Sequence, residues 1–256
     1  MNKYCKTTPE GTRDLLFEEC EAIHRVEQRL TGLFQKRGFH EVMTPALEYY
    51  DVFAKDASGM PQEMMYKLSD SRGRLMVLRP DCTLPIARLT STRLRNGGLP
   101  LRLYSNQRVY RANQRLTGRS DEIAQAGVEL IGASGVRADL EMIVTAVEAL
   151  KACGAPDFIL EIGHAGVFKA VSEQLPLDES GREDVRTFIE SKNYGALNAL
   201  LDKLPDNPAT RAVRSLPRLF GGEEVFGQAL NLCGELVKEP LEYLRTLYRD
   251  LSVPEF

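Results

Sequence analysis

Two hydrophobic periods alternate along the first part of the chain. Between residues 15 and 37 the apolar residues recur at steps of three and four and stop at Gly38, which predicts one long amphipathic helix. The same spacing predicts a helix over 136–153, closed by Gly154. A third helix is expected from Thr83, because Pro85 then falls in the first turn, where its missing N–H removes no hydrogen bond; Gly97-Gly98 should end it.

Shorter segments rich in strand-forming residues lie between these helices. Residues 39–42 predict a short strand that ends at Thr44-Pro45, since the residue before proline favours an extended backbone. The segments MYKLSD and RLMVLRP, on either side of a turn at 71–73, predict a β-hairpin. A second antiparallel pair is expected at 101–111 and 123–133, joined by a polar connection that holds Gly118, and a further strand is expected at 158–162.

The pattern changes after Gly163. Segments 166–204 and 209–237 are almost wholly of helical character, with expected breaks at Pro176, Gly195, Pro205 and Gly221-Gly222. We therefore expect a soft boundary near residue 165, with a core at 1–165 and a mainly helical segment at 166–256. Strands and hairpins with a few helices, followed by a helical segment, indicate the α+β class.

Composition excludes several functional classes. The 256 residues hold 33 basic and 36 acidic side chains, a net charge of -3, which does not favour a nucleic-acid partner. No apolar run approaches the roughly 18 residues that span a bilayer, and the N-terminal segment lacks a signal peptide, so we expect a cytoplasmic protein without membrane association. Five cysteines form no CxxC pair and three histidines form no ligand cluster, so we expect free thiols and no metal.

Candidate chemistry begins at the segment IAQAGVELIG. Strand alternation places Gln125, Gly127 and Glu129 on one face, with Ala126, Val128 and Leu130 on the other. An amide and a carboxylate separated by a glycine could hold a ligand that carries an ammonium or an imidazole N–H. An ordinary strand with a solvated polar face explains the same pattern.

Arg111 and the turn that holds Asp81 and Thr83 each allow a structural and a ligand-binding interpretation. Arg111 could reach a ligand carboxylate or phosphate, or it could be one of several exposed arginines around a loop. Asp81 and Thr83 are typical capping residues, and the same turn could hold a ligand ammonium against the Asp81 carboxylate.

Several ordered segments together resemble the histidyl branch of the class II aminoacyl-tRNA synthetases. They are PEGTRDLL, GFHEVMTPALE, LMVLRPDCTLPIAR and RVYRANQRLTGRSDEIAQAGVELIG, which look like that branch's N-terminal segment, motif 1, first amino-acid-binding loop and motif 2. The resemblance covers roughly residues 8–165. It implies a class II synthetase-like antiparallel sheet flanked by helices.

The departures from that family bear on catalysis. Its motif 2 has a glutamate two residues after the arginine, where this chain has Asn113, and a further arginine ten residues after it, where this chain has Asp121. A carboxylate repels a triphosphate, so we expect that ATP activation is lost. The motif 3 arginine does not occur within the 256 residues.

The segments LEIGHAGVFKAV and LPRLFGGEEVF resemble a non-catalytic branch, the regulatory subunits of short-form ATP phosphoribosyltransferase. That resemblance implies a protein without cofactor or chemistry of its own, which assembles with a separate catalytic subunit, is required for the first step of histidine biosynthesis and lets histidine inhibit it. It also implies a homodimer with Pro45 at the motif 1 contact. The histidine-binding positions carried over are Asp81, Thr83, Arg111, Gln125 and Glu129.

Two other functional classes stay open. The chain could be a catalytic-domain fragment of a divergent histidyl-tRNA synthetase, or an amino-acid-binding module without an enzyme partner. Both related families have a tyrosine-rich strand after the helical region, which this sequence lacks, so we expect a truncated chain with an unpaired sheet edge.

Overall fold

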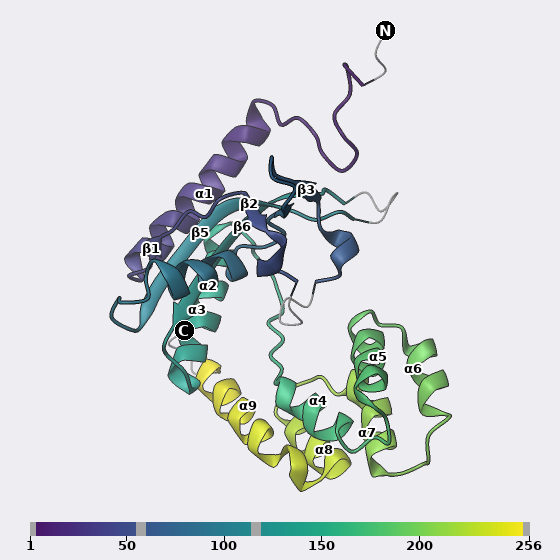
Figure 1. Ribbon diagram of the computed structural model, residues 1–256. Helices are drawn as coiled ribbons and strands as arrows, with labels where there is room; N and C mark the ends of the chain where they lie inside the picture. Colours follow the sequence, from purple (N-terminus) through teal and green to yellow (C-terminus); the bar gives the residue numbers. More distant parts are fainter. Residues whose placement is uncertain (1–3, 55–59, 114–118, 253–256) are drawn as a thin grey trace. The chain divides into compact units, whose positions relative to one another are not determined.

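The computed structural model describes residues 4–54, 60–113 and 119–252, and the polar connection around Gly118 lies largely outside them. The chain divides into two compact units, Met1–Phe158 and Ile159–Phe256 (Figure 1). The first unit is built on strands with helices packed against them, and the second is helical, as expected for an α+β protein.

The main sheet of the first unit has the order β1-β5-β6. Strands β5 (Leu101–Tyr110) and β6 (Glu122–Ile131) form the expected antiparallel pair, with Leu103 opposite Glu129 and Gln107 opposite Gln125. Strand β1 (His40–Glu41) is only two residues long and runs parallel to β5, so the sheet is not wholly antiparallel as the resemblance implied.

A second, smaller sheet has the order β2-β4-β3. Strands β3 (Lys67–Ser69) and β4 (Leu75–Leu78) form the predicted hairpin, and β2 (Leu47–Tyr49) pairs antiparallel with the other edge of β4. The Asp70 carboxylate accepts hydrogen bonds from the backbone N–H groups of Arg72 and Arg74, and this closes the hairpin turn.

Helices cover both faces of the β5–β6 pair. Helices α1 (Glu18–Lys36) and α3 (Val136–Ala152) pack against the face that carries Tyr104 and Val128. Helix α2 (Thr83–Thr92) packs against the opposite face, where Cys82 and Ile86 join Leu103 and Val109 in a second cluster. Because side chains alternate along a strand, one hairpin supports two separate cores.

The second unit consists of short helices around one apolar cluster that includes Val185, Leu197, Leu201 and Val213. Side-chain caps at Asp178, Asn193 and Asn207 begin three of the helices by accepting hydrogen bonds from free backbone N–H groups. The helices are α4 (Ala165–Ser172), α5 (Glu179–Glu190), α6 (Tyr194–Leu201), α7 (Pro208–Ser215), α8 (Glu224–Cys233) and α9 (Lys238–Leu251).

Three sequence-based expectations about elements are wrong. Residues 158–162 form no strand, since no strand in the described part of the chain pairs with them and Ile159 is exposed. Gly195 does not break a helix but lies in the first turn of α6; the break falls at Lys192, whose φ is 56°. Helix α2 ends at Thr92 rather than at Gly97-Gly98, because the backbone turns through Leu94 and Gly97 instead.

Candidate functional site

The five candidate ligand-binding residues meet around the turn Pro80–Thr83, where α2 begins. From β6, the Gln125 side-chain oxygen accepts a hydrogen bond from the Cys82 N–H at 3.1 Å, and Glu129 accepts one from the Thr83 hydroxyl. Asp81 accepts a hydrogen bond from the Leu84 N–H at 3.1 Å, so it does cap α2. Capping uses one carboxylate oxygen of Asp81 and leaves the other for a ligand.

Arg111 reaches the same turn from the end of β5. Its Nε donates a hydrogen bond to the Pro80 carbonyl at 2.8 Å, and its side chain is half-buried. Five N–H donors belong to a guanidinium, so most of them remain available for a carboxylate or a phosphate.

The charge balance of this turn favours a cation. Burial is the main cause that raises the pKa of the Glu129 carboxyl, and the nearby Asp81 charge adds to it. The hydrogen bond from Thr83 lowers the pKa, but the net result is a pKa above the ordinary value. A half-buried carboxylate beside a second carboxylate gains most from a positive group placed between the two. A molecule with an ammonium at Asp81 and Glu129 and a carboxylate at Arg111 matches this arrangement, which is the pattern of a free amino acid.

Pro45 lies apart from this turn and is exposed. Its neighbour Thr44 is buried, and its backbone N–H and carbonyl both bond the Gln107 side-chain amide. Arg79, which is also buried, donates to the Thr44 carbonyl at 2.6 Å and to the Arg108 carbonyl at 2.8 Å. The segment around Pro45 is therefore fixed to β5 while its outer surface faces solvent.

Asn113 and Asp121, noted in the sequence only for what they replace, have partners of their own. The Asn113 side-chain amide donates to the Ser120 carbonyl at 2.9 Å and to Asp121 Oδ1 at 3.1 Å. Asp121 is nine-tenths buried and also accepts a hydrogen bond from the Tyr66 hydroxyl. Sequence reasoning missed this cluster because its members are far apart in the chain.

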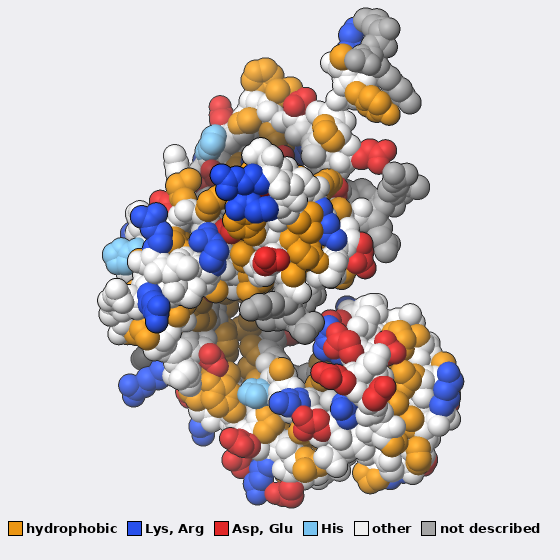
Figure 2. Space-filling model, in the orientation of Figure 1, with side chains coloured by type: hydrophobic (Ala, Val, Ile, Leu, Met, Phe, Trp, Pro, Cys, Tyr) orange, Lys and Arg blue, Asp and Glu red, His pale blue; other side chains and the backbone are white. Residues whose placement is uncertain are grey.

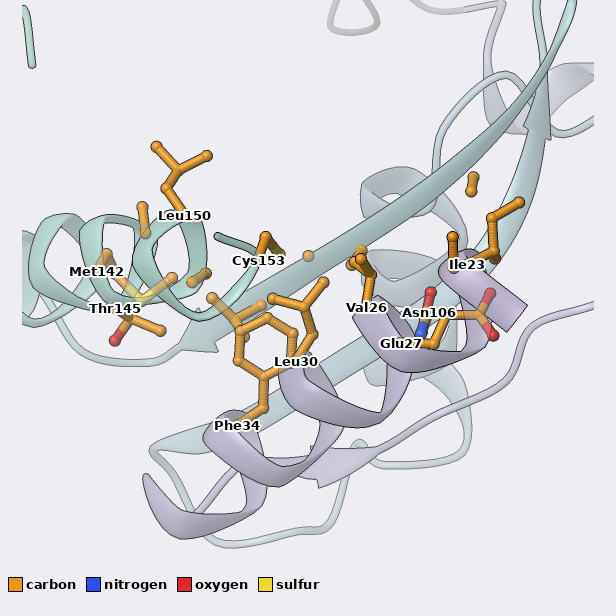
Figure 3. A pocket seen from close by; sticks show the side chains of 17 residues that line it. Ile23, Val26, Glu27, Leu30, Phe34, Asn106, Met142, Thr145, Leu150 and Cys153 are labelled. Atoms are coloured by element: carbon orange, nitrogen blue, oxygen red, sulfur yellow. The ribbon is translucent and has the colours of Figure 1, made fainter. Parts of the chain in front are cut away.

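A hollow of about 820 Å³ lies on the other face of the hairpin, between α1 and α3 (Figure 3). Ile23, Val26, Leu30 and Phe34 of α1 and Met142 of α3 are among the side chains that line it. It contains few polar groups, so it offers a zwitterionic ligand little compensation for lost hydration. The chemistry of the α2 face, and not the size of this hollow, identifies the candidate site.

Other kinds of site find little support in the described residues. They contain no group of three or more His, Cys, Asp or Glu placed to hold a metal ion. None of the described helices has the length and apolar character needed to cross a membrane. On the face of the first unit seen in Figure 2, basic side chains are interspersed with hydrophobic and acidic ones.

Comparison with known proteins agrees with the sequence resemblance. The family model described as histidyl-tRNA synthetase matches residues 11–253. A relative from Clostridium kluyveri named ATP phosphoribosyltransferase regulatory subunit is 42% identical over 97% of this chain and 64% of its own length. One of the same name from Bacillus mycoides is 42% identical over 91% of this chain and 56% of its own length. The chain thus spans about three fifths of the length of these relatives.

Solved structures agree on the fold. The structure titled ATP phosphoribosyltransferase regulatory subunit/histidyl-tRNA synthetase from Bacillus halodurans has a TM-score of 0.88 at 32% identity, covering 98% of this chain and 66% of that one. A histidine–tRNA ligase subunit from Alicyclobacillus acidocaldarius has a TM-score of 0.74 at 22% identity, covering 96% and 76%, which shows a shared fold. These matches confirm the class II synthetase-like fold, and the chain belongs to the histidyl-tRNA synthetase family.

Proposed function

We propose that the protein is the non-catalytic regulatory subunit of a short-form ATP phosphoribosyltransferase and carries histidine feedback to the first step of histidine biosynthesis. One arrangement carries the proposal. The side chains around the turn Pro80–Thr83 are suited to bind an amino acid, while the neighbouring motif 2 positions Asn113 and Asp121 lack the groups that would bind ATP. Relatives at 42% identity with the regulatory-subunit name support it. The free cysteines suit a reducing compartment, so we place the protein in the cytoplasm.

The case against catalysis rests on Asn113 and Asp121. Activation of an amino acid by ATP needs cationic groups where negative charge develops on the phosphates. Asp121 instead presents a buried carboxylate, held by Tyr66 and Asn113. Asn113 offers an amide whose N–H₂ group is already engaged. ATP would thus meet a negative charge beside Arg111.

We assign histidine to the turn Pro80–Thr83. In this assignment Arg111 holds the ligand carboxylate, Asp81 and Glu129 hold its ammonium and imidazole N–H groups, and Gln125 and Thr83 orient them. The convergence of these side chains and the raised pKa of Glu129 support the assignment.

Reconstitution tests the function directly. The full-length protein is mixed with the short catalytic subunit, and phosphoribosyl-ATP formation is measured with and without histidine. We expect the catalytic subunit alone to be nearly inactive and the mixture to be active and inhibited by histidine. Equal turnover with and without the regulatory chain would contradict the proposal, and inhibition of the isolated catalytic subunit by histidine would remove its regulatory half.

Thermodynamic coupling between histidine binding and assembly gives a second test with the same mixture. If histidine disfavours the active assembly, substrates that favour that assembly must weaken histidine binding by the same factor, typically about 1–3 kcal/mol of coupling free energy. Titrating histidine with and without phosphoribosyl pyrophosphate measures this factor. Identical affinities would mean that the two sites are not coupled.

The alternative is a divergent histidyl-tRNA synthetase. It predicts histidine-dependent exchange of pyrophosphate into ATP by the full-length protein, whereas the regulatory proposal predicts none. Robust exchange would favour the synthetase.

We further propose a homodimer formed through residues 38–48. This segment exposes 75% of Met43 and 43% of Leu47, next to the exposed Pro45, while its backbone is fixed to β5. A rigid, partly apolar surface of this kind is suited to self-association about a two-fold axis. Leu47→Arg should give a monomer in light scattering, while Leu236→Arg, an equally drastic change at an exposed leucine of the second unit, should not.

A further inference from the structure

Asp121 joins three segments that are distant in the sequence. Its carboxylate accepts hydrogen bonds from the Tyr66 hydroxyl and from the backbone N–H of Asn113 at 3.0 Å. Its own backbone N–H donates to the Gly11 carbonyl at 2.7 Å. Among the described residues no ion pair includes Asp121, so hydrogen bonds compensate this nine-tenths buried carboxylate.

Gly11 packs so closely against the Asp121 side chain that no larger residue fits at position 11. Its φ of +76° suits glycine, and a Cβ atom added there would lie 2.8 Å from the Asp121 Cβ and closer still to the carboxylate. Ser120 adds a further bond, from its hydroxyl to the Gly11 carbonyl at 3.2 Å. The N-terminal turn is thereby held against the start of β6.

Asp121 is connected to Arg111 by two short routes, one through its backbone carbonyl and one through its carboxylate. The Arg111 backbone N–H donates to the Asp121 carbonyl at 2.8 Å, which continues the β5–β6 ladder by one pair. The Arg111 carbonyl accepts from the Asn113 side chain at 3.2 Å, and Asn113 is itself held by the Asp121 carboxylate. The Arg111 N–H is therefore bonded directly to the Asp121 backbone, and the Arg111 carbonyl is linked through Asn113 to the Asp121 carboxylate.

We infer that Asp121 is a positioning residue for ligand recognition: with Gly11 and Tyr66 it fixes the backbone of Arg111, so that the guanidinium faces the turn at Pro80 before a ligand arrives. A pre-oriented guanidinium loses less entropy when it binds a carboxylate. The inference rests on the proposed function insofar as the ligand is histidine.

The ionisation of the cluster agrees with this role. Burial raises the pKa of Asp121, but the hydrogen bonds from Tyr66 and Asn113 outweigh it and bring the pKa below its ordinary value. The bond to Asp121 is the main cause that raises the pKa of Tyr66 to about 12. At neutral pH the carboxylate is charged and the phenol keeps its proton, so both hydrogen-bonding roles are satisfied.

Two substitutions and two matched controls test the inference in the full-length protein. Asp121→Asn weakens the carboxylate's bonds, and Gly11→Ala pushes against Asp121 from outside the site. Asp70→Asn is the control for the first, since Asp70 also holds two backbone N–H groups. Gly73→Ala is the control for the second, since Gly73 has the same φ of +76° but open space around it.

The ligands are histidine and histamine, which lacks the carboxylate assigned to Arg111. Calorimetry should show that Asp121→Asn and Gly11→Ala each weaken histidine binding about tenfold and leave histamine binding nearly unchanged, with neither control doing so. An equal loss for both ligands would mean a general structural defect and would overturn the inference. No loss for either ligand would overturn it as well.

Hydrogen exchange gives a readout that needs no ligand. Mass spectrometry should show faster exchange of the Arg111 and Asn113 amides in both site variants than in both controls, and unchanged exchange would overturn the inference. If the parent binds no histidine, the ligand assignment fails while this measurement still decides the inference. If Asp121→Asn does not fold, Tyr66→Phe takes its place, since it removes a single hydrogen bond to Asp121.

Discussion

The two faces of the β5–β6 hairpin differ in chemistry although they alternate residue by residue. On one face Tyr104 is fully buried against Leu30 and Phe34 of α1. On the other, Gln125 and Glu129 meet the start of α2 with half-buried polar groups. Both faces carry an apolar core, but the second also holds half-buried polar groups, which cost stability and are suited to bind a ligand.

The largest expected effect falls on the apolar face. Phe34 is 3% exposed and packs against Tyr104, so Phe34→Ala should lower the free energy of unfolding by about 3–5 kcal/mol. Urea denaturation of the full-length protein measures this. The histidine affinity of the molecules that remain folded should change little, and a loss comparable to that of a Glu129 variant would mean that the two faces are not separable.

The polar face should show the reverse behaviour. Glu129→Ala should weaken histidine binding by about 1.5–3 kcal/mol, the range for a hydrogen bond to a charged group. Calorimetry on the full-length protein measures the change. Unchanged affinity would place the ligand elsewhere.

A pH dependence of stability sharpens the contrast further. Because the folded-state pKa of Glu129 lies above its ordinary value, the folded protein keeps a proton that the unfolded chain has already released. The free energy of unfolding should therefore fall as pH rises from the ordinary Glu value of 4.5 through the raised folded value. Glu129→Gln should remove this fall, whereas the exposed Glu161→Gln should not. Identical pH profiles for Glu129→Gln and the parent would argue against a raised pKa of Glu129 in the folded protein.

The smallest effect is expected at Ala126. It lies on the same face as Val128 but is exposed, beside the hollow between α1 and α3. Ala126→Ser should change the free energy of unfolding by no more than about 0.5 kcal/mol and leave histidine binding unchanged. A larger loss of stability would show that this part of the apolar face is covered in the full-length protein.

Local pattern was enough to predict the elements that carry the candidate site. The alternation in IAQAGVELIG predicted which β6 residues share a face, and the capping residues and Pro85 predicted where α2 begins. Each of these features depends on neighbours within a few residues, which a sequence displays directly.

Features that depend on distant partners were not predictable. Residues 158–162 have strand-forming side chains, but a strand also needs a neighbour to pair with. Gly195 was a poor indicator of a break because glycine is tolerated in a first turn once Asn193 supplies the cap. In the sequence Asp121 indicates only the absence of a cation, since nothing nearby shows that Tyr66 and Gly11 would contact it.

The Asp121 cluster also constrains how the sequence can change. Asp121→Arg would place a guanidinium where a carboxylate now accepts bonds from Tyr66 and Asn113, and it would leave those donors facing a cation. Gly11, whose turn fits closely against that side chain, would have to move as well. The effect of a change at one of these four positions therefore depends on the other three, a case of epistasis. A single substitution to arginine at position 121 should be selected against for its loss of stability alone.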